Sequence, residues 1–297
     1  MIRYGMAALA FKTFSLNDAT KQAYRWLGNR FGAKRRQNAD LDVYVRRGNL
    51  LVELYRKHAA PRPADRVLEL GTGWMHWYAV YLRLFFDVRI TTLDVWDNRQ
   101  FAAFKSCFSR LRARMDREPV PPACRAALDG VLAAQSFEQA YAALGLNHVI
   151  VPDGSLAQFP HAAFGSVFSM HVLEHVQRDA VPRLVADLHR ILRPGAITIH
   201  QIGIDDHLAH YDRTASRKQY LAYSDRLWAA LFENDVQYFN RLQLSDWIRA
   251  FEQAGFVVLD TVAEKTDLRR LRISPAFSRY GHDDLACTIA TLVLRRA

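Results

Sequence analysis

The 297-residue chain is 50% hydrophobic and 24% charged, a composition typical of a globular protein with a sizeable core and not of a disordered one. Its three cysteines, Cys107, Cys124 and Cys287, form no CxxC pair, which argues against a disulfide framework and a cysteine zinc site. The formal net charge is +10, and residues 1–60 hold twelve Lys or Arg against four Asp or Glu, so the excess lies near the N-terminus.

Residues 1–60 are expected to form a basic helical segment, separated by Pro61 and Pro63 from a second unit over residues 61–297. The apolar stretch 6–11 is too short for the roughly 20 residues that span a bilayer, so we expect no signal peptide and a cytoplasmic protein. A basic segment suits nucleic acid, anionic lipid or an acidic substrate. We expect it to cover the substrate entrance as a lid and to permit peripheral membrane contact.

From residue 67 onward, short β-rich runs alternate with helical patterns; residues 77–86 can form one helix, and residues 179–192 form the clearest one. This alternation predicts an α/β fold with a Rossmann-like, doubly wound, mostly parallel seven-stranded sheet. The expected strands are residues 67–70, 90–94, 148–151, 167–170, 196–201, 256–261 and 287–294.

Two segments between expected strands are too long for ordinary loops, residues 99–147 and 207–243. Both have helical character and are rich in aromatic or basic residues. We expect them to be cap insertions that shape a substrate site.

The first expected strand ends at a glycine turn, Glu69-Leu70-Gly71-Thr72-Gly73, where the backbone can bend tightly and approach a ligand. Asp94 ends the next strand, from which a carboxylate can accept hydrogen bonds from both hydroxyls of a ribose. Bulky Trp74 and Met75 follow the turn and no third glycine completes a dinucleotide fingerprint, which favours a nucleoside cofactor without phosphates.

Four segments, residues 67–74, 91–94, 168–176 and 188–195, together resemble the successive motifs of class I S-adenosylmethionine (SAM)-dependent methyltransferases, in particular the type-11-like members that act on small molecules. The resemblance implies SAM as the cofactor. It implies that Glu69 orients the loop beside the methionine amino group and that Asp94 holds the ribose. The other implied cofactor contacts are Gly71, Thr72 and Gly73 in the turn, Asp153, Gly154 and Ser155 near the adenine, and Met170, with Ser169 and His171, beside the methionine moiety.

Methyl transfer requires alignment of a nucleophile and removal of its proton, a step that suits histidine at neutral pH. Our candidates for catalysis are His175, after the fourth strand, and His200, Asp206 and His207, expected after the fifth. His175 is equally compatible with helix capping. The cluster around His207 is interpreted as a general-base and substrate-orienting loop, with a divalent cation site as the alternative that we favour less.

The leading hypothesis is a SAM-dependent methyltransferase that methylates a small, sugar-like or lipid-linked acceptor at oxygen, with nitrogen as the next choice of acceptor atom. A second hypothesis is an RNA or protein methyltransferase, motivated by the basic N-terminus and by Arg110, Arg112, Arg114 and Arg117. No RNA-binding signature accompanies these arginines, so a nucleic-acid partner is not favoured. A third hypothesis is a catalytically silent partner subunit. The acceptor and the oligomeric state are not predicted.

Overall fold

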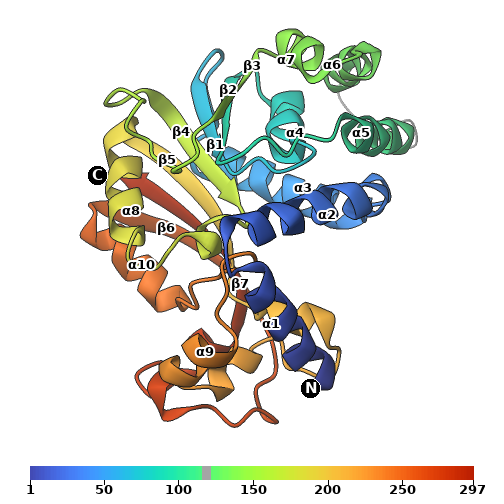
Figure 1. Ribbon diagram of the computed structural model, residues 1–297. Helices are drawn as coiled ribbons and strands as arrows, with labels where there is room; N and C mark the ends of the chain where they lie inside the picture. Colours follow the sequence, from blue (N-terminus) through green and yellow to red (C-terminus); the bar gives the residue numbers. More distant parts are fainter. Residues whose placement is uncertain (116–121) are drawn as a thin grey trace.

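A computed structural model describes residues 1–115 and 122–297 and shows a seven-stranded sheet flanked by helices (Figure 1). The strand order is β3-β2-β1-β4-β5-β7-β6, with β7 antiparallel to both of its neighbours and the other pairs parallel. The predicted Rossmann-like sheet is confirmed. The strands are β1 (Arg66–Leu70), β2 (Arg89–Asp94), β3 (Leu146–Ile150), β4 (Phe164–Met170), β5 (Leu192–Gly203), β6 (Phe256–Lys265) and β7 (Cys287–Arg296).

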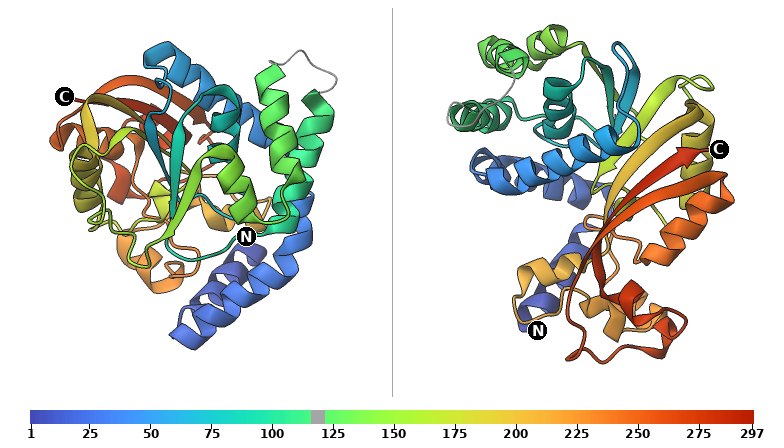
Figure 2. Two further views of the ribbon diagram at one scale, coloured as in Figure 1. Left: turned by 90° about the horizontal axis from the view of Figure 1, so that it is seen from above. Right: turned by 180° about the vertical axis from the view of Figure 1, so that it is seen from behind.

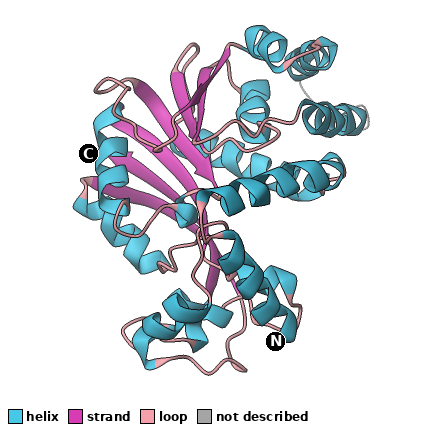
Figure 3. Cartoon of the chain, viewed as in Figure 1, coloured by secondary structure: helices cyan, strands magenta, loops and turns pink. Residues whose placement is uncertain are grey.

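Helices cover both faces of the sheet and extend beyond one of its edges (Figure 3). The α-helices are α1 (Ile2–Phe14), α2 (Asp18–Gln37), α3 (Leu41–His58), α4 (Trp77–Phe85), α5 (Phe101–Met115), α6 (Pro122–Ala133), α7 (Phe137–Leu144), α8 (Val181–Ile191), α9 (Asp225–Leu231), α10 (Leu244–Gln253) and α11 (His282–Ala286). The 3-10 turns are η1 (Leu173–His175), η2 (His207–Tyr211), η3 (Gln219–Ala222) and η4 (Pro275–Phe277).

Alternating side chains of the strands build a separate core on each face of the sheet. Val67 and Phe168 pack into the cluster formed with α3 to α7, whereas Leu68 and Val167 pack into the cluster formed with α8 and α10. Figure 2 shows these two helical layers on opposite sides of the strands. Because both faces are covered, the ends of the strands are where a ligand can reach the sheet.

A third hydrophobic cluster lies outside the two layers and joins α1 to the 207–243 insertion. Tyr4 and Phe11 of α1 pack there with Tyr220, Trp228 and Phe239. By contrast, α3 packs on the sheet through residues such as Tyr55, whereas α2 has no fully buried side chain. The three N-terminal helices therefore pack mainly on different elements, α1 on η2, α2 on α5 and α3 on α4.

The other insertion, residues 99–147, forms α5, α6 and α7 beside α4 (Figure 1). Two of its arginines are held by ion pairs, Arg112 with Asp129 inside the insertion and Arg114 with Asp42 of α3. Arg117 lies outside the described residues. Within the described part of the chain, no helix combines the length and the apolar character needed to cross a membrane.

Candidate active site

The glycine turn after β1 has the tight geometry expected from the sequence. Gly71 and Gly73 have φ angles of 66° and 70°, in the left-handed region that favours glycine. Gly71 also touches the segment after β4, because a Cβ built on it would lie 2.4 Å from Cγ2 of Val172. The hydroxyl of Thr72 donates a hydrogen bond of 2.7 Å to the Glu69 carboxylate.

Alanine substitutions at the two glycines should separate backbone strain from steric clash. We expect Gly73→Ala to cost about 1 to 2 kcal/mol of unfolding free energy, the strain of a left-handed alanine. Gly71→Ala should cost more, because its new Cβ also meets Val172, whereas the Cβ at Gly73 meets no atom within 4 Å. Urea unfolding of both variants, and of Gly71→Ala combined with Val172→Ala, measures the difference. Equal costs at the two positions would contradict the proposed contact.

Glu69 is buried at the base of the glycine turn. Burial raises the pKa of its carboxyl to about 8, partly offset by the hydrogen bond from Thr72. An ammonium group placed beside this carboxyl would stabilise its ionised form. Glu69 therefore suits the amino group of an amino-acid ligand.

Asp94 lies at the end of β2, across from the glycine turn. Its carboxylate accepts hydrogen bonds from the backbone N–H of Gly73 at 3.0 Å and of Val95 at 2.8 Å. Burial raises the pKa of Asp94, and the backbone donors oppose that shift. The aspartate thus holds the glycine turn and the end of β2 in one arrangement.

The turn after β3 contains the predicted adenine contacts. The Asp153 carboxylate accepts a hydrogen bond of 3.0 Å from the backbone N–H of Ser155, and Gly154 between them has a φ of 65°. A Cβ on Gly154 would lie 3.5 Å from Val95, the residue after Asp94. The structure thus brings the turn after β3 beside the end of β2.

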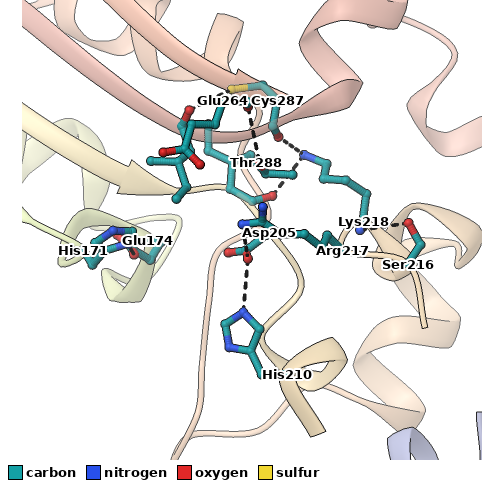
Figure 4. Close-up of polar contacts among 12 residues, drawn as sticks. His171, Glu174, Asp205, His210, Ser216, Arg217, Lys218, Glu264, Cys287 and Thr288 are labelled. Carbon is teal, nitrogen blue, oxygen red and sulfur yellow. Dashed lines mark hydrogen bonds and ion pairs between the residues drawn. The ribbon is translucent and has the colours of Figure 1, made fainter. Parts of the chain in front are cut away.

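At the end of β4, Met170 is buried and His171 adopts a left-handed φ of 57°. His171 Nδ1 lies 3.2 Å from the carboxylate of Glu174, which is fully enclosed (Figure 4). Gly203 leaves room for this pair, because a Cβ there would lie 2.6 Å from Glu174 Oε1. His171 Nε2 and Glu174 Oε2 are buried without a hydrogen-bond partner among the described residues. Glu174 is not among the site residues predicted from the sequence.

His200 is not on the rim, contrary to the expectation that it follows the fifth strand. β5 continues to Gly203, and the His200 ring is fully buried and stacks on Phe251 at 5.3 Å. The Thr198 hydroxyl donates to the backbone oxygen of Val167, so His200 Nε2 donates to Thr198 and Nδ1 accepts from Ser169, each at 2.8 Å. Both ring nitrogens are occupied, which leaves no lone pair for a general base.

His200 should instead make stability depend on pH. Burial lowers its pKa from 6.5 to about 3, so between these values the unfolded chain binds a proton that the folded chain does not. This histidine therefore lowers the free energy of unfolding as the pH falls, by up to about 1.4 kcal/mol per pH unit. Below pH 6.5, denaturant titrations of His200→Gln should show a smaller decrease in unfolding free energy per pH unit than those of the native protein. The control His282→Gln changes an exposed histidine and should behave like the native protein. Identical pH slopes in all three would contradict the assignment.

Asp206 also differs from its expected catalytic position. It is fully buried, accepts a hydrogen bond of 2.7 Å from the Tyr4 hydroxyl, and caps η2 through the backbone N–H of Leu208. Burial raises its pKa to about 6. Its contacts make it an anchor for α1, and it does not line the cavity described below.

Asp205 and Lys218, after β5, each have a separate set of hydrogen bonds (Figure 4). Asp205 accepts hydrogen bonds from His210 at 3.1 Å and Arg217 at 3.0 Å. Lys218 is fully buried and donates to the backbone oxygens of Ile204 and Cys287 and to the Gln243 side chain. These contacts fix the base of the 207–243 insertion.

His175 and His207 do come together, with ring centroids 5.0 Å apart. His175 Nδ1 lies 2.7 Å from the backbone oxygen of Tyr238, so Nδ1 carries the proton and Nε2 keeps a free lone pair. Burial, with the adjacent His175, lowers the pKa of His207 to about 4. Ligand atoms of Glu174, His175 and His207 all lie within 4.8 Å of one another, so these three residues are the described ones that could hold a divalent cation.

A cavity of about 680 Å³ connects the cofactor loops with His175. Trp74 of the glycine turn, Val95 after Asp94, and His175 line it, and one wall is formed by α2. The guanidinium of Arg36 in α2 lies 4.0 Å from the Trp74 ring centroid. A second cavity of about 720 Å³, lined by residues such as Thr214 and Arg269, includes none of the predicted site residues.

The sheet order and the site at the ends of β1, β2 and β4 define a class I methyltransferase fold. The chain belongs to the family described as methyltransferase domain, whose model matches residues 22–261. It is a SAM-dependent methyltransferase. No curated protein matches the chain in sequence.

Solved structures share the fold at low sequence identity. One is a protein of Galdieria sulphuraria assigned as a sarcosine dimethylglycine methyltransferase, with a TM-score of 0.50 and 14% identity over 85% of this chain and 86% of that one. Phosphoethanolamine N-methyltransferase 2 of Haemonchus contortus has a TM-score of 0.46 and 12% identity over 84% and 52%. Geranyl diphosphate C-methyltransferase of Streptomyces coelicolor has a TM-score of 0.47 and 14% identity over 84% and 79%.

Proposed function

We propose that this enzyme methylates a small acceptor at oxygen, with the acceptor bound in the 680 Å³ cavity beneath α2. The observation that carries the proposal is the lining of that cavity. Trp74 and Val95 place the cofactor loops on one side of it, and His175 places a histidine with a free lone pair on another. A methyl donor and a proton acceptor can therefore face the same bound molecule.

The residues present fit SAM as the methyl donor. Asp94 would hold the ribose, the turn at Asp153 would lie beside the adenine, and Glu69 would face the amino group. His171 Nε2 and Glu174 Oε2 offer buried polar atoms without described partners near the methionine part. When bound, SAM supplies an electrophilic methyl group on a positively charged sulfur.

His175 is the group that we assign to the proton step. The carbonyl of Tyr238 fixes its tautomer, so Nε2 can accept the proton of an acceptor hydroxyl as the oxygen attacks the methyl group. The cavity walls hold the hydroxyl in line with the methyl group and reduce the entropic cost of the reaction. His207 packs beside His175 and also contacts the rings of Phe239 at 4.7 Å and His210 at 5.8 Å, which limits the motion of the pair.

The charge of the cavity favours an acceptor that carries an anionic group. Four cations of α2, Lys21, Arg25, Arg35 and Arg36, line the cavity together with one acidic residue, Asp235. Lys21 pairs with Asp235 at 2.6 Å, which leaves the three arginines as the excess charge. A sugar-like or lipid-linked acceptor with a phosphate or carboxylate matches this surface.

Binding and product analysis test the proposal in sequence. Calorimetry with S-adenosylhomocysteine first tests the cofactor site, without any acceptor. Screening of hydroxylated acceptors with isotope-labelled SAM then tests the reaction, using matched pairs with and without a phosphate. We expect methyl ethers on the phosphorylated members. Labelling of RNA or protein alone would overturn the small-molecule proposal, and absence of S-adenosylhomocysteine binding would identify the silent-subunit alternative.

The proposed cellular location is based on the three cysteines. Cys107, Cys124 and Cys287 are all free and buried, which suits a reducing compartment such as the cytoplasm.

A further inference from the structure

Exposed apolar side chains are concentrated at the N-terminus. Among the large apolar residues of the described chain, the six most exposed all lie in the first 31 positions: Ile2 at 81%, Leu16 at 74%, Phe31 at 73%, Leu9 at 69%, Met6 at 65% and Trp26 at 63%. Soluble proteins expose single apolar residues routinely, whereas a concentration of this kind marks a binding surface.

Helix α1 has apolar residues on two opposite sides. Tyr4, Ala8 and Phe11 follow one another at i, i+4 and i+7 and are buried against the insertion. Ile2, Met6 and Leu9 repeat the same spacing on the opposite side and are exposed. Since one side already provides the packing that holds α1 in place, the second apolar side has no role in the fold of the described chain.

Helix α2 combines exposed aromatic rings with positive charge. Trp26, Arg30 and Lys34 follow at successive i+4 positions, and all three are exposed. The Phe31 ring packs edge-on against Trp26 at 6.5 Å. Residues 1–37 contain eight Lys or Arg and a single acidic residue, Asp18, which gives a net side-chain charge of +7.

We propose that α1 and α2 bind the enzyme peripherally to an anionic lipid membrane. Large apolar and aromatic side chains beside Lys and Arg are the composition of interfacial helices, which insert their apolar residues and keep their cations at the lipid headgroups. The net positive charge of α1 and α2 favours an anionic bilayer over an uncharged apolar protein surface as the binding partner. Both helices lie away from α8 and α10 (Figure 1).

The proposed membrane surface adjoins the cavity beneath α2. Phe31 is strongly exposed and also lines that cavity. A docked enzyme would therefore open its cavity next to the bilayer, the position needed for a lipid-linked acceptor. This consequence for the acceptor rests on the proposed function, whereas membrane binding itself does not.

Vesicle co-sedimentation of the full chain tests the surface without any acceptor. We expect binding to vesicles of equal parts phosphatidylcholine and phosphatidylglycerol, weak binding to pure phosphatidylcholine, and a decrease in binding at high salt. Trp26→Ser, and separately Ile2→Ser with Met6→Ser and Leu9→Ser, should each weaken binding roughly tenfold or more through lost apolar burial. Arg30→Glu with Lys34→Glu should weaken binding to the anionic vesicles by reversing two charges.

A matched control removes apolar side chains elsewhere. Val257→Ser with Val262→Ser changes two exposed residues of β6 and should leave vesicle binding unaltered. The Trp26 and α1 variants should keep the native melting temperature and S-adenosylhomocysteine binding. This result would show that they are folded, and it would keep the test of membrane binding separate from the test of the cofactor site. Vesicle binding that is absent in the native protein, or that survives all the α1 and α2 changes, would overturn the proposal. A dimer in light scattering that these same changes dissociate would instead assign the surface to a second copy of the chain.

Discussion

Asp94→Ala is expected to weaken binding of S-adenosylhomocysteine by roughly ten- to more than a hundredfold, equivalent to about 1.5 to 3 kcal/mol. The substitution removes the charged acceptor proposed for the ribose hydroxyls. It also removes the acceptor for the backbone N–H of Gly73, so the glycine turn loses one of its restraints. Isothermal titration calorimetry with S-adenosylhomocysteine measures the change directly.

A nearby acidic residue provides the control for this variant. Asp97 lies three positions after Asp94 but pairs with Arg99 at 2.8 Å, and we expect Asp97→Ala to retain most of the affinity. Asp94→Asn should give an intermediate loss, because the amide oxygen can still accept one of the hydrogen bonds. Native affinity in a folded Asp94→Ala variant would disprove the cofactor site assigned here.

His175→Ala is expected to lower turnover by about 10²- to 10⁴-fold, the usual contribution of a general base. Binding of S-adenosylhomocysteine should remain unchanged, since His175 contacts the acceptor side of the cavity. Steady-state kinetics with the acceptor found by labelled-SAM screening, together with calorimetry, separates the two effects. His282→Ala, which alters an exposed histidine distant in sequence from the site, should leave both measurements unaltered.

Metal removal distinguishes the base from a cation site at the same residues. We expect chelator-treated enzyme to keep its turnover, because the proposed proton transfer needs only the Nε2 lone pair of His175. Loss of turnover on chelation, with recovery on adding a divalent cation, would assign Glu174, His175 and His207 to metal binding and contradict the base role. Normal turnover of His175→Ala would show that this histidine is structural.

The sequence predicted the sheet and the glycine turn well because their signals are local. Gly71 and Asp94 each stand at the end of a short β-rich run. The position of such an end can be predicted without information about tertiary contacts. The fifth strand shows the limit of this approach. His200 lies within the predicted strand 196–201 but was grouped with the polar residues that follow it on the rim, whereas β5 continues to Gly203 and the strand's alternation directs the ring into the core against Phe251.

Contacts between distant segments were beyond sequence analysis. Asp206 accepts a hydrogen bond from Tyr4, 202 positions earlier, and no local sequence pattern predicts that contact. The wall that α2 contributes to the cavity likewise depends on how the helix crosses the ends of the strands. His175 was located correctly after the fourth strand, but its tautomer follows from the carbonyl of Tyr238, which belongs to another insertion.

The third hydrophobic cluster gives α1 and the 207–243 insertion a core of their own, whose residues can change independently of the sheet. Residues that hold α1 to the insertion, such as Tyr4, Phe11 and Trp228, pack separately from the two cores that support the sheet. Substitutions in this cluster can shift α1 and the insertion while the loops at Gly71 and Asp94 keep their geometry. Acceptor preference can thus drift in evolution, or be redesigned, while the methyl-donor site keeps its structure.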